Sequence, residues 1–388
     1  MPSLAHRFVE KGIRLQSALA SRPKTARRST FAVSGGPQTP LQKWFIDGVE
    51  RELLRHGHPR PANGTPPELV FNVIDEDRPR PFRRNSQGTF VVSVVQVDHQ
   101  PEDLLKAAYP VLVRSLSNLL VYITRADDGA RTNFVTLEQG YSTIPAPDGD
   151  AAGFFAEVYR RLAPLASTRL VINNVFEKDL APELWDGDVH TRALYEAGRW
   201  LDRMDLLPAA FPITELLDER DMLHVRRLFG IGGLSYGNLS ARRDEASFWM
   251  SARGVNKGNL RDVGRDILLI KGYIPEDNAM IVSVPPEVEP RSASVDAIEH
   301  WMLYKEHPGI GAIIHVHAWM DGIDSTQINY PCGTYELAHE VAQLARRQPD
   351  PARAVIGLRN HGLTITGLSL EDIIDRIDGR LLPTVPMM

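Results

Sequence analysis

Two histidines one residue apart, His315 and His317, follow a run of aliphatic residues in the segment AIIHVHAWM (312–320). The aliphatic run predicts a buried strand, and residues two apart on a strand point to the same face. Two imidazoles that share a dry face cannot both carry a proton, and a divalent metal ion bound by both neutral rings removes this conflict. The pair indicates either a metal site or two half-exposed strand histidines without a ligand role.

A third histidine, His361, lies in a second apolar segment, AVIGLRNHGLTITG (354–367), which also predicts a strand. The glycine after it allows close approach of backbone or substrate. Three protein ligands with one open position are typical of a catalytic zinc site rather than of a structural one. The expected cofactor is therefore a divalent metal, with Zn²⁺ first and Fe²⁺ or Mn²⁺ left open, because three imidazoles do not choose between these ions.

A second pair of the same spacing, His56 and His58, serves as an internal comparison. It lies in RHGHPRPANGTPPE, which is rich in proline and glycine and predicts turns. No strand fixes the directions of these two side chains, and a metal site needs ligands of preset geometry. We therefore expect no metal there.

The composition excludes several classes of protein. The chain has 388 residues, is 43% hydrophobic and 24% charged, and predicts globular structure with two domains or one large one. No apolar run reaches the roughly 18 residues that suggest a membrane span. The net charge of -5 gives no reason to expect nucleic-acid binding. Cys332 is the only cysteine, so a disulfide framework is impossible and a cytoplasmic location is expected.

The first 205 residues predict an N-terminal domain of unknown role. Residues 1–40 hold seven basic residues and one acid, which suggests either a transit peptide or a short amphipathic helix with a loose linker. Residues 41–205 predict an α+β domain, for which a ferredoxin-like βαββαβ sandwich is one candidate. A scaffold, an oligomerisation module and a small-ligand sensor all fit it. The elements behind this prediction are a strand at 88–98, a helix at 101–117, strands at 118–125 and 132–139, a helix at 151–167 and a strand at 168–176.

The remainder, residues 210–388, predicts a second α/β domain in which polar residues and glycines gather at strand ends. From about 215 to 375 the sequence resembles the class II aldolase/adducin family, in particular domains of the L-fuculose-phosphate aldolase type. Single motifs of this kind are weak, but six in the family's order are specific. The matching segments are YGNLSAR (236–242), SARG (251–254), SVD (294–296), IIHVHA (313–318), YPCGTYELA (330–338) and NHGL (360–363).

The resemblance implies a three-layer α/β/α domain around a central, mainly antiparallel sheet, and a homo-oligomer, commonly a tetramer. It implies metal ligation by His315, His317 and His361. It places Asp296 where the family has its catalytic glutamate, although a charge at a helix N-terminus is an alternative role. His300, one turn later, could orient Asp296 or simply lie on the helix face. The substrate-binding positions carried over are Asn238, Ser251, Arg253, Gly254 and Ser294.

Three departures from the family pattern bear on the substrate and the reaction. Val295 replaces a phosphate-binding serine, and Arg253 brings a guanidinium that suits a carboxylate as well as a phosphate, unless it is only a surface cation. The stretch between His317 and Tyr330 is shorter than in the aldolases and omits their tyrosine acid, for which Tyr330 or Tyr335 could substitute.

The sequence thus predicts a metal-dependent lyase that breaks or forms a C–C bond in a small hydroxycarbonyl substrate, either sugar-like or carboxylate-bearing. Two alternatives remain. The same metal site could serve an epimerase, a dehydratase, a decarboxylase or an iron-dependent oxygenase. The domain could also be a non-enzymatic, adducin-like interaction module, although the retained histidines argue against this.

Overall fold

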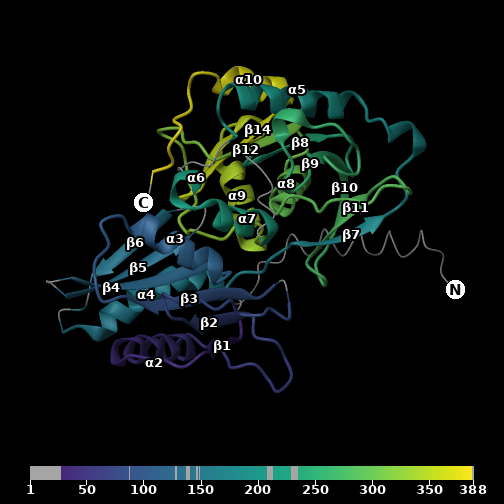
Figure 1. Ribbon diagram of the computed structural model, residues 1–388. Coiled ribbons are helices and arrows are strands. Elements are labelled where there is room, and N and C mark those ends of the chain that lie inside the picture. The colour runs from purple at the N-terminus through teal and green to yellow at the C-terminus, as the bar shows by residue number, and fades with distance from the viewer. Residues whose placement is uncertain are drawn as a thin grey trace.

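The computed structural model describes residues 28–86, 88–126, 129–136, 140–145, 147, 149–207, 213–228 and 235–386. The chain forms two sheets, each flanked by helices, with the first below the second in the view of Figure 1. Most of the basic N-terminal segment, residues 1–27, lies outside the described residues, as does most of the predicted boundary at 206–212.

The first sheet has six strands in sequence order. Neighbours from β1 to β4 are parallel, and β5 and β6 continue the sheet antiparallel. Helices α2 and α4 pack on one face, and α3, α6 and α7 pack on the other. The strands are β1 (Phe31–Ser34), β2 (Leu69–Val73), β3 (Phe90–Gln96), β4 (Leu119–Ala126), β5 (Gly129–Thr136) and β6 (Gly140–Pro145); the helices are α2 (Pro40–Arg55), α3 (Leu104–Arg114), α4 (Ala151–Ala166), α6 (Ile213–Leu216) and α7 (Glu219–Leu228).

The ferredoxin-like prediction is wrong. In that fold the two strands of a βαβ unit are split by a third strand, whereas β3 and β4 are direct parallel neighbours. Three strands of this sheet escaped prediction: FAVS (β1), which lies in the supposed linker, LVFNV (β2), which lies between proline-rich stretches, and GYSTIP (β6). The strand predicted at 168–176 is also not part of this sheet: β7 (Asn173–Glu177) pairs with β11 in the second one.

The second sheet has eight strands in the order β13-β14-β12-β8-β9-β10-β11-β7, and every pair except β11–β7 is antiparallel. Helices α5 and α10 pack on β8, β9, β12 and β14, and Figure 1 shows both helices above the sheet. Helices α8 and α9, which pack on each other, contact β10 and β13 from the other side. The remaining bounds are β8 (Asn238–Arg242), β9 (Phe248–Ser251), β10 (Ile267–Ile274), β11 (Ala279–Ser283), β12 (Ala312–Val316), β13 (Val355–Leu358), β14 (Gly362–Gly367), α5 (Val189–Arg203), α8 (Ala297–Glu306), α9 (Tyr335–Arg347) and α10 (Leu370–Ile377), with short 3₁₀ turns η1 (Pro182–Leu184), η2 (Lys257–Asn259) and η3 (Pro351–Arg353).

This three-layer arrangement around a mainly antiparallel sheet confirms the predicted fold of the C-terminal half. The packing, however, divides the chain differently from the predicted boundary at 205–210. Strand β7 pairs with β11 of the second sheet, and Val171, just before β7, together with Leu194 and Leu201 of α5, lies in the core of that sheet. Helices α6 and α7 instead pack on α3 of the first sheet. A change in composition can mark a loop. It does not show on which sheet the helices and strands on either side of that loop pack.

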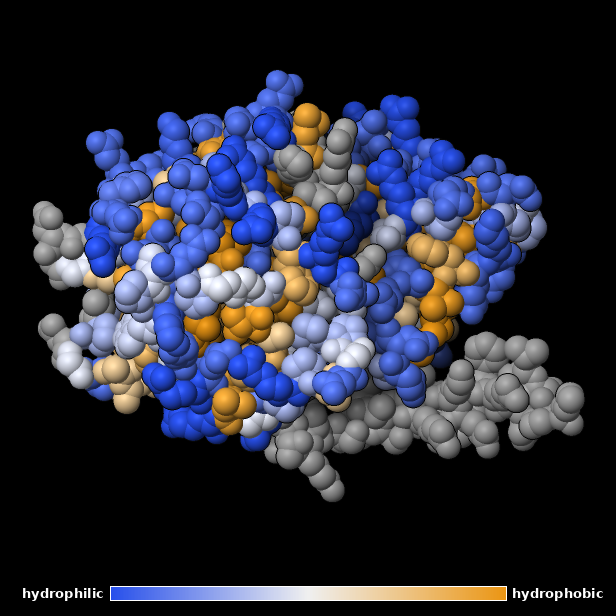
Figure 2. Space-filling view, turned by 60° about the horizontal axis from the view of Figure 1, so that its bottom comes forward, coloured by the Kyte–Doolittle hydropathy of each residue, from blue (hydrophilic) through white to orange (hydrophobic). Residues whose placement is uncertain are grey.

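Among the described residues, none of the helices is both long and apolar enough to cross a bilayer. Hydrophilic side chains cover most of the face shown in Figure 2, with small groups of apolar side chains between them. Such scattered exposure of apolar residues is normal for a protein surface.

The docking of α7 on α3 can be tested through Asp221, whose side chain is 1% exposed and accepts two hydrogen bonds from Arg114, at 3.0 and 2.8 Å. Asp221→Ala removes a bidentate charged pair, so we expect the free energy of unfolding to fall by about 1–3 kcal/mol in urea titrations. Glu219→Gln, on the exposed side of the same helix, is the control and should change it by less than about 0.5 kcal/mol. Equal effects of the two variants would mean that α7 does not dock there.

Candidate metal centre

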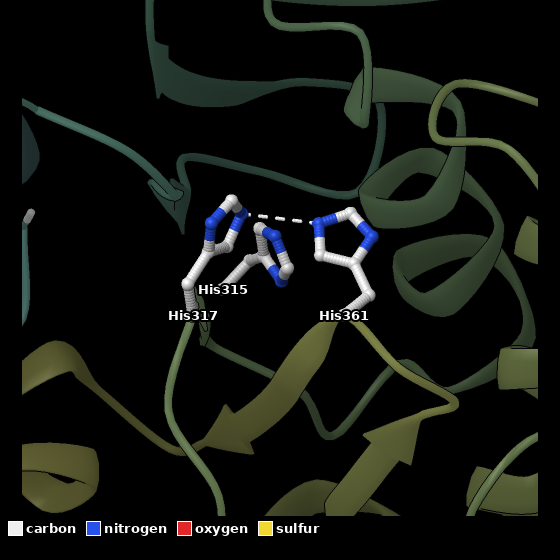
Figure 3. Close-up of side chains that lie close together, drawn as sticks. All are labelled: His315, His317 and His361. Atoms are coloured by element: carbon white, nitrogen blue, oxygen red, sulfur yellow. Dashed lines mark hydrogen bonds between the residues drawn. The ribbon is translucent and has the colours of Figure 1, made fainter. Parts of the chain in front are cut away.

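The three predicted ligands come together because of one antiparallel strand pair. His315 lies on β12, His317 directly follows it, and His361 directly precedes β14. The register pairs His315 with Thr364 and Val316 with Leu363, which places His361 beside His317. Figure 3 shows the three rings converging from these two segments.

The turn before β14 is shaped to allow this approach. Asn360 adopts a positive φ of 57°, which few residue types other than glycine tolerate. At Gly362 a Cβ atom would lie 2.2 Å from the carbonyl oxygen of Val316, so only glycine fits against β12. The glycine that the sequence placed after His361 therefore provides close backbone approach, as predicted.

The rings lie at distances that suit one shared ion. Ring centroids are 4.7–5.2 Å apart, and one nitrogen from each ring lies within 4.8 Å of the other two. His317 Nε2 and His361 Nε2 are 3.0 Å apart. His315 and His361 are buried, and His317 is partly buried. In the part of the chain that the structure describes, this is the one such cluster of candidate ligands.

The protonation of His315 fits a metal ligand. Its Nδ1 lies 3.0 Å from the carbonyl oxygen of Leu363 and donates its proton there. The lone pair is therefore on Nε2, which is buried without a hydrogen-bond partner among the described residues. A backbone carbonyl that fixes the tautomer in this way is a common second partner of metal-bound histidine.

All three imidazoles are held neutral. Burial lowers the pKa of His315, although the charge of Asp296 and the bond to Leu363 oppose this. Burial and the neighbouring rings lower the pKa values of His317 and His361 well below the usual value for histidine. Neutral, buried nitrogens that point together fit a divalent metal ion such as Zn²⁺.

The second histidine pair, His56 and His58, makes contacts of a different kind. His58 is buried, and its nitrogens contact the carbonyl oxygen of Ser29 at 3.2 Å and the hydroxyl of Tyr159 at 3.0 Å. His56 stacks on Tyr159 with ring centroids 3.6 Å apart. Both residues thus make contacts within the protein.

Asp296 lies at the N-terminal boundary of α8 but does not cap the helix with its side chain. Its carboxylate is mostly buried, and Oδ2 accepts a hydrogen bond of 2.8 Å from Nδ2 of Asn238. Asn238 is the cross-strand neighbour of His315 on β8. The carboxylate therefore points toward the histidine cluster rather than along its own helix, which disfavours the simple helix-end role.

His300 does not orient Asp296 in the way that its spacing suggested. Its Nδ1 lies 2.7 Å from the hydroxyl of Ser240, which in turn lies 2.8 Å from the hydroxyl of Tyr304. Complete burial lowers the pKa of His300 to about 3, so the ring stays neutral. His300 is thus a buried residue in a hydrogen-bond network with the hydroxyl groups of Ser240 and Tyr304.

The predicted substrate loops lie side by side, because a bridge pairs Ala252 with Ala293. Gly254 has a φ of 68°, as a tight turn requires, and the backbone N–H of Arg253 donates to Ser292. Ser251 is fully buried and its hydroxyl accepts from the backbone of Leu239, so it supports the sheet. Substrate contacts of Asn238, Ser251, Arg253, Gly254 and Ser294 stay predictions.

Two buried charged residues near the site were missed from the sequence. Lys257, only 4% exposed, donates from Nζ to the carbonyl oxygens of Ser235 and Val255, at 2.8 and 3.4 Å. Burial lowers its pKa to about 8, opposed by the charge of Asp296. Glu299, 2% exposed, lies one turn after Asp296. Lys257 lies in a polar stretch that gave no signal, whereas the position of Glu299 three residues after Asp296 could have been noticed.

Tyr330 and Tyr335 were proposed as substitute acids, but the tyrosine ring in contact with the histidine cluster is that of Tyr236. Tyr335 stacks on His339 and lies under the guanidinium of Arg169. Tyr236 has its ring 5.4 Å from that of His317, centroid to centroid. The thiol of Cys332 also reaches the cluster, with Sγ 3.1 Å from Nδ1 of His361.

Comparison with known proteins supports the resemblance to the class II aldolase/adducin family. Residues 223–320 match the family model described as the Class II Aldolase and Adducin N-terminal domain. Two curated relatives, methylthioribulose-1-phosphate dehydratases of two Leptospira biflexa strains, are 28% identical over 145 residues, which is 36% of this chain and 58% of theirs. The chain thus spans less than two thirds of the length of these relatives. The C-terminal half resembles the class II aldolase/adducin family, as its motifs indicated.

Similar solved structures include an L-fuculose 1-phosphate aldolase, at 18% identity and a TM-score of 0.33, covering 48% of this chain and 79% of that one. The L-fuculose-1-phosphate aldolase of Thermus thermophilus has 20% identity and a TM-score of 0.29, covering 47% of this chain and 85% of its own. At such scores, the fold assignment rests on the sheet and helices described above.

Metal analysis tests the site directly. We expect about one divalent ion per chain in the wild type, and loss of that ion in His315→Ala and His361→Ala, because two imidazoles hold a metal less tightly than three. His56→Ala, from the other histidine pair, is the matched control and should retain the ion. The measurement is metal content by mass spectrometry after anaerobic purification, which also separates zinc from iron. Equal metal content in all four proteins would eliminate the site.

Proposed function

We propose that the C-terminal domain is a metal-dependent lyase that acts on a small hydroxycarbonyl compound. The observation that carries this proposal is the convergence of three neutral histidines, one with an unpartnered buried Nε2, beside the carboxylate of Asp296. The matched family model is consistent with it. The proposed cofactor is Zn²⁺, held by His315, His317 and His361.

The residues divide the work between binding and proton transfer. When bound, the metal would polarise the substrate's carbonyl group and stabilise the negative charge that develops on its oxygen. Asp296 is the proposed general base, and Nδ2 of Asn238 holds one oxygen of its carboxylate. Oδ1 of Asn238 is buried without a partner among the described residues and is free to accept from a substrate hydroxyl.

Two reactions are candidates, and they differ in which bond near the carbonyl group of the substrate breaks. C–C cleavage is the reaction that the sequence motifs predict. Loss of water from the neighbouring carbon is the second candidate. It is favoured because the curated relatives are named as dehydratases. The short stretch between His317 and Tyr330 also favours it, because the aldolases' tyrosine acid has no counterpart there. Loss of water begins when a base removes the proton from the carbon next to the carbonyl group. C–C cleavage instead begins with loss of the proton from the hydroxyl group on the far carbon and ends with protonation of the carbon next to the carbonyl group. In both reactions the proposed role of Asp296 is to move the proton at that carbon, so the site described here suits either.

We also propose an oligomeric state and a cellular location for the enzyme. A homo-oligomer acting in the cytoplasm is consistent with the family resemblance and with the single cysteine, Cys332. An adducin-like role as a pure interaction module gives no reason for three converging neutral histidines, and we do not favour it.

Direct assay distinguishes the two candidate reactions. Zinc-loaded protein is incubated separately with methylthioribulose 1-phosphate and with L-fuculose 1-phosphate, and products are followed by mass spectrometry. We expect dehydration of the first or cleavage of the second, and loss of the activity in His361→Ala. If the fully loaded wild type converts neither compound nor a panel of related hydroxycarbonyl acids, the lyase proposal fails.

The role of Asp296 predicts a separation of kinetic constants. Asp296→Asn keeps the shape and removes the base, so kcat should fall roughly 10²- to 10⁴-fold, with metal content unchanged and KM little affected. Asp296→Glu, which restores the family's residue, should retain far more activity than the asparagine variant. If Asp296→Asn is as active as the wild type, another group is the base.

A further inference from the structure

We propose that Lys257 is a positioning residue, which holds residues 235–238 in place beside the three histidines. This rests on the proposed function, in which Asn238 holds the carboxylate of the base Asp296. Neither the sequence motifs nor the matched family description assigns a role to Lys257. It acts through the segment that it holds, and it is therefore not itself a catalytic residue.

The first support is that Lys257 binds this segment twice and connects it to a second loop. The backbone N–H of Lys257 donates to the hydroxyl of Ser235 at 2.9 Å, and Nζ donates to the carbonyl oxygen of the same residue at 2.8 Å. Nζ also donates to the carbonyl oxygen of Val255, at 3.4 Å. Because Val255 follows the tight turn at Gly254, one side chain links the loop before β8 to the loop after β9.

The second support is that the sheet does not hold residues 235–238 over their whole length. On the side of β12 the ladder begins at Asn238, and on the side of β9 it begins only at Ser240. Among the described residues, those before Asn238 thus have no ladder partner on either side. The two bonds from Lys257 to Ser235 take the place of ladder bonds there.

The third support is that the segment contacts both the proposed metal ligands and the proposed base. The ring of Tyr236 lies 5.4 Å from that of His317, centroid to centroid. Nδ2 of Asn238 donates to the carboxylate of Asp296 at 2.8 Å. A shift of residues 235–238 therefore disturbs both contacts at once, and outer contacts of this kind orient the groups that bind metal.

A lysine suits this task although its burial is costly. Lys257 is only 4% exposed, and an ammonium group in such a place loses most of its hydration. Its long stem and three donors let it reach two carbonyl oxygens at once, a combination that among natural side chains only lysine and arginine offer. The negative charge of Asp296 acts favourably on Lys257 and offsets part of the cost.

Hydrogen–deuterium exchange, read by mass spectrometry on the zinc-loaded protein, tests this hold without any turnover. Lys257→Met keeps the length of the side chain and removes its donors, so the amides of residues 236–241 should exchange at least about tenfold faster than in the wild type. Lys305→Met is the matched control, because Nζ of Lys305 also donates to a backbone carbonyl oxygen, that of Glu245, beyond the other end of β8. It should leave exchange in residues 236–241 unchanged.

Unchanged exchange in Lys257→Met overturns the proposal, as does an equal acceleration in Lys305→Met. The bond from Tyr236 to Leu207 and the ladder from Asn238 onward remain in Lys257→Met, so loosening rather than unfolding is expected. If Lys257→Met nevertheless fails to fold, Ser235→Ala removes only one of the three bonds and takes its place. A smaller increase in exchange is then expected, and no increase overturns the proposal.

Kinetics separate this proposal from the proposed function. With whichever substrate is turned over, Lys257→Met should lower kcat about 10- to 100-fold, as loss of outer partners of a metal site commonly does. Zinc content should be unchanged, because the three ligands lie on or beside β12 and β14.

A double-mutant cycle identifies the route of the effect. Because Lys257 acts through the segment that carries Asn238, Lys257→Met combined with Asn238→Ala should be no less active than the weaker of the two single variants. Losses that multiply in the double variant refute the role of Lys257 alone. Failure of the wild type to turn over any substrate refutes the lyase function, whereas the exchange result still stands.

Discussion

The candidate site depends on one structural constraint, the central place of β12 between β8 and β14. Its antiparallel register brings Asn238, His315 and Thr364 into one row and places His361 beside His317. A slip by one residue would turn His315 to the opposite face of the sheet. Glycines enforce the close approach on both sides, since a Cβ atom at Gly237 would lie 2.3 Å from the carbonyl oxygen of His315 and one at Gly362 would lie 2.2 Å from that of Val316.

The same arrangement concentrates unsatisfied polar atoms. Asn238 Oδ1, Glu299 Oε2, His300 Nε2 and His315 Nε2 are all buried without hydrogen-bond partners among the described residues. Native proteins leave few buried polar atoms in this condition, because each costs about 1–3 kcal/mol. Their gathering around β12 and α8 is consistent with the proposed site, in which a bound metal ion and a substrate would supply partners that the protein's own side chains do not. The proposed metal ion would account for Nε2 of His315, and the proposed substrate, through a hydroxyl group, would account for Oδ1 of Asn238.

Prediction from sequence succeeded where the signal was local and failed where it depended on pairing. The spacing of His315 and His317 fixed their common face, and the glycine after His361 indicated close approach, so the three-histidine cluster was predictable. The first sheet was not, because FAVS and LVFNV are strands of only four and five residues, and their parallel partners are distant in sequence. Lys257 and Glu299 were missed for a related reason. Burial of a charged side chain depends on what packs over it, and α8 is buried on all sides, which no helical periodicity reveals.

The N-terminal part of the chain cannot be separated from the site at the point that composition suggested. Strand β7 closes one edge of the second sheet by pairing with β11, and α5 packs on β8 and β9, the former of which carries Asn238. Arg169 and Leu170, just before β7, contact the start of α9: the backbone N–H of Arg169 donates to Glu336, and Leu170 bridges to Thr334. Cys332, two residues before Thr334, contacts His361. A fragment beginning at residue 210 would lack β7, α5 and the contacts of Arg169 and Leu170 with the start of α9. The segment from about 169 to 203 is therefore part of the fold that positions the three histidines.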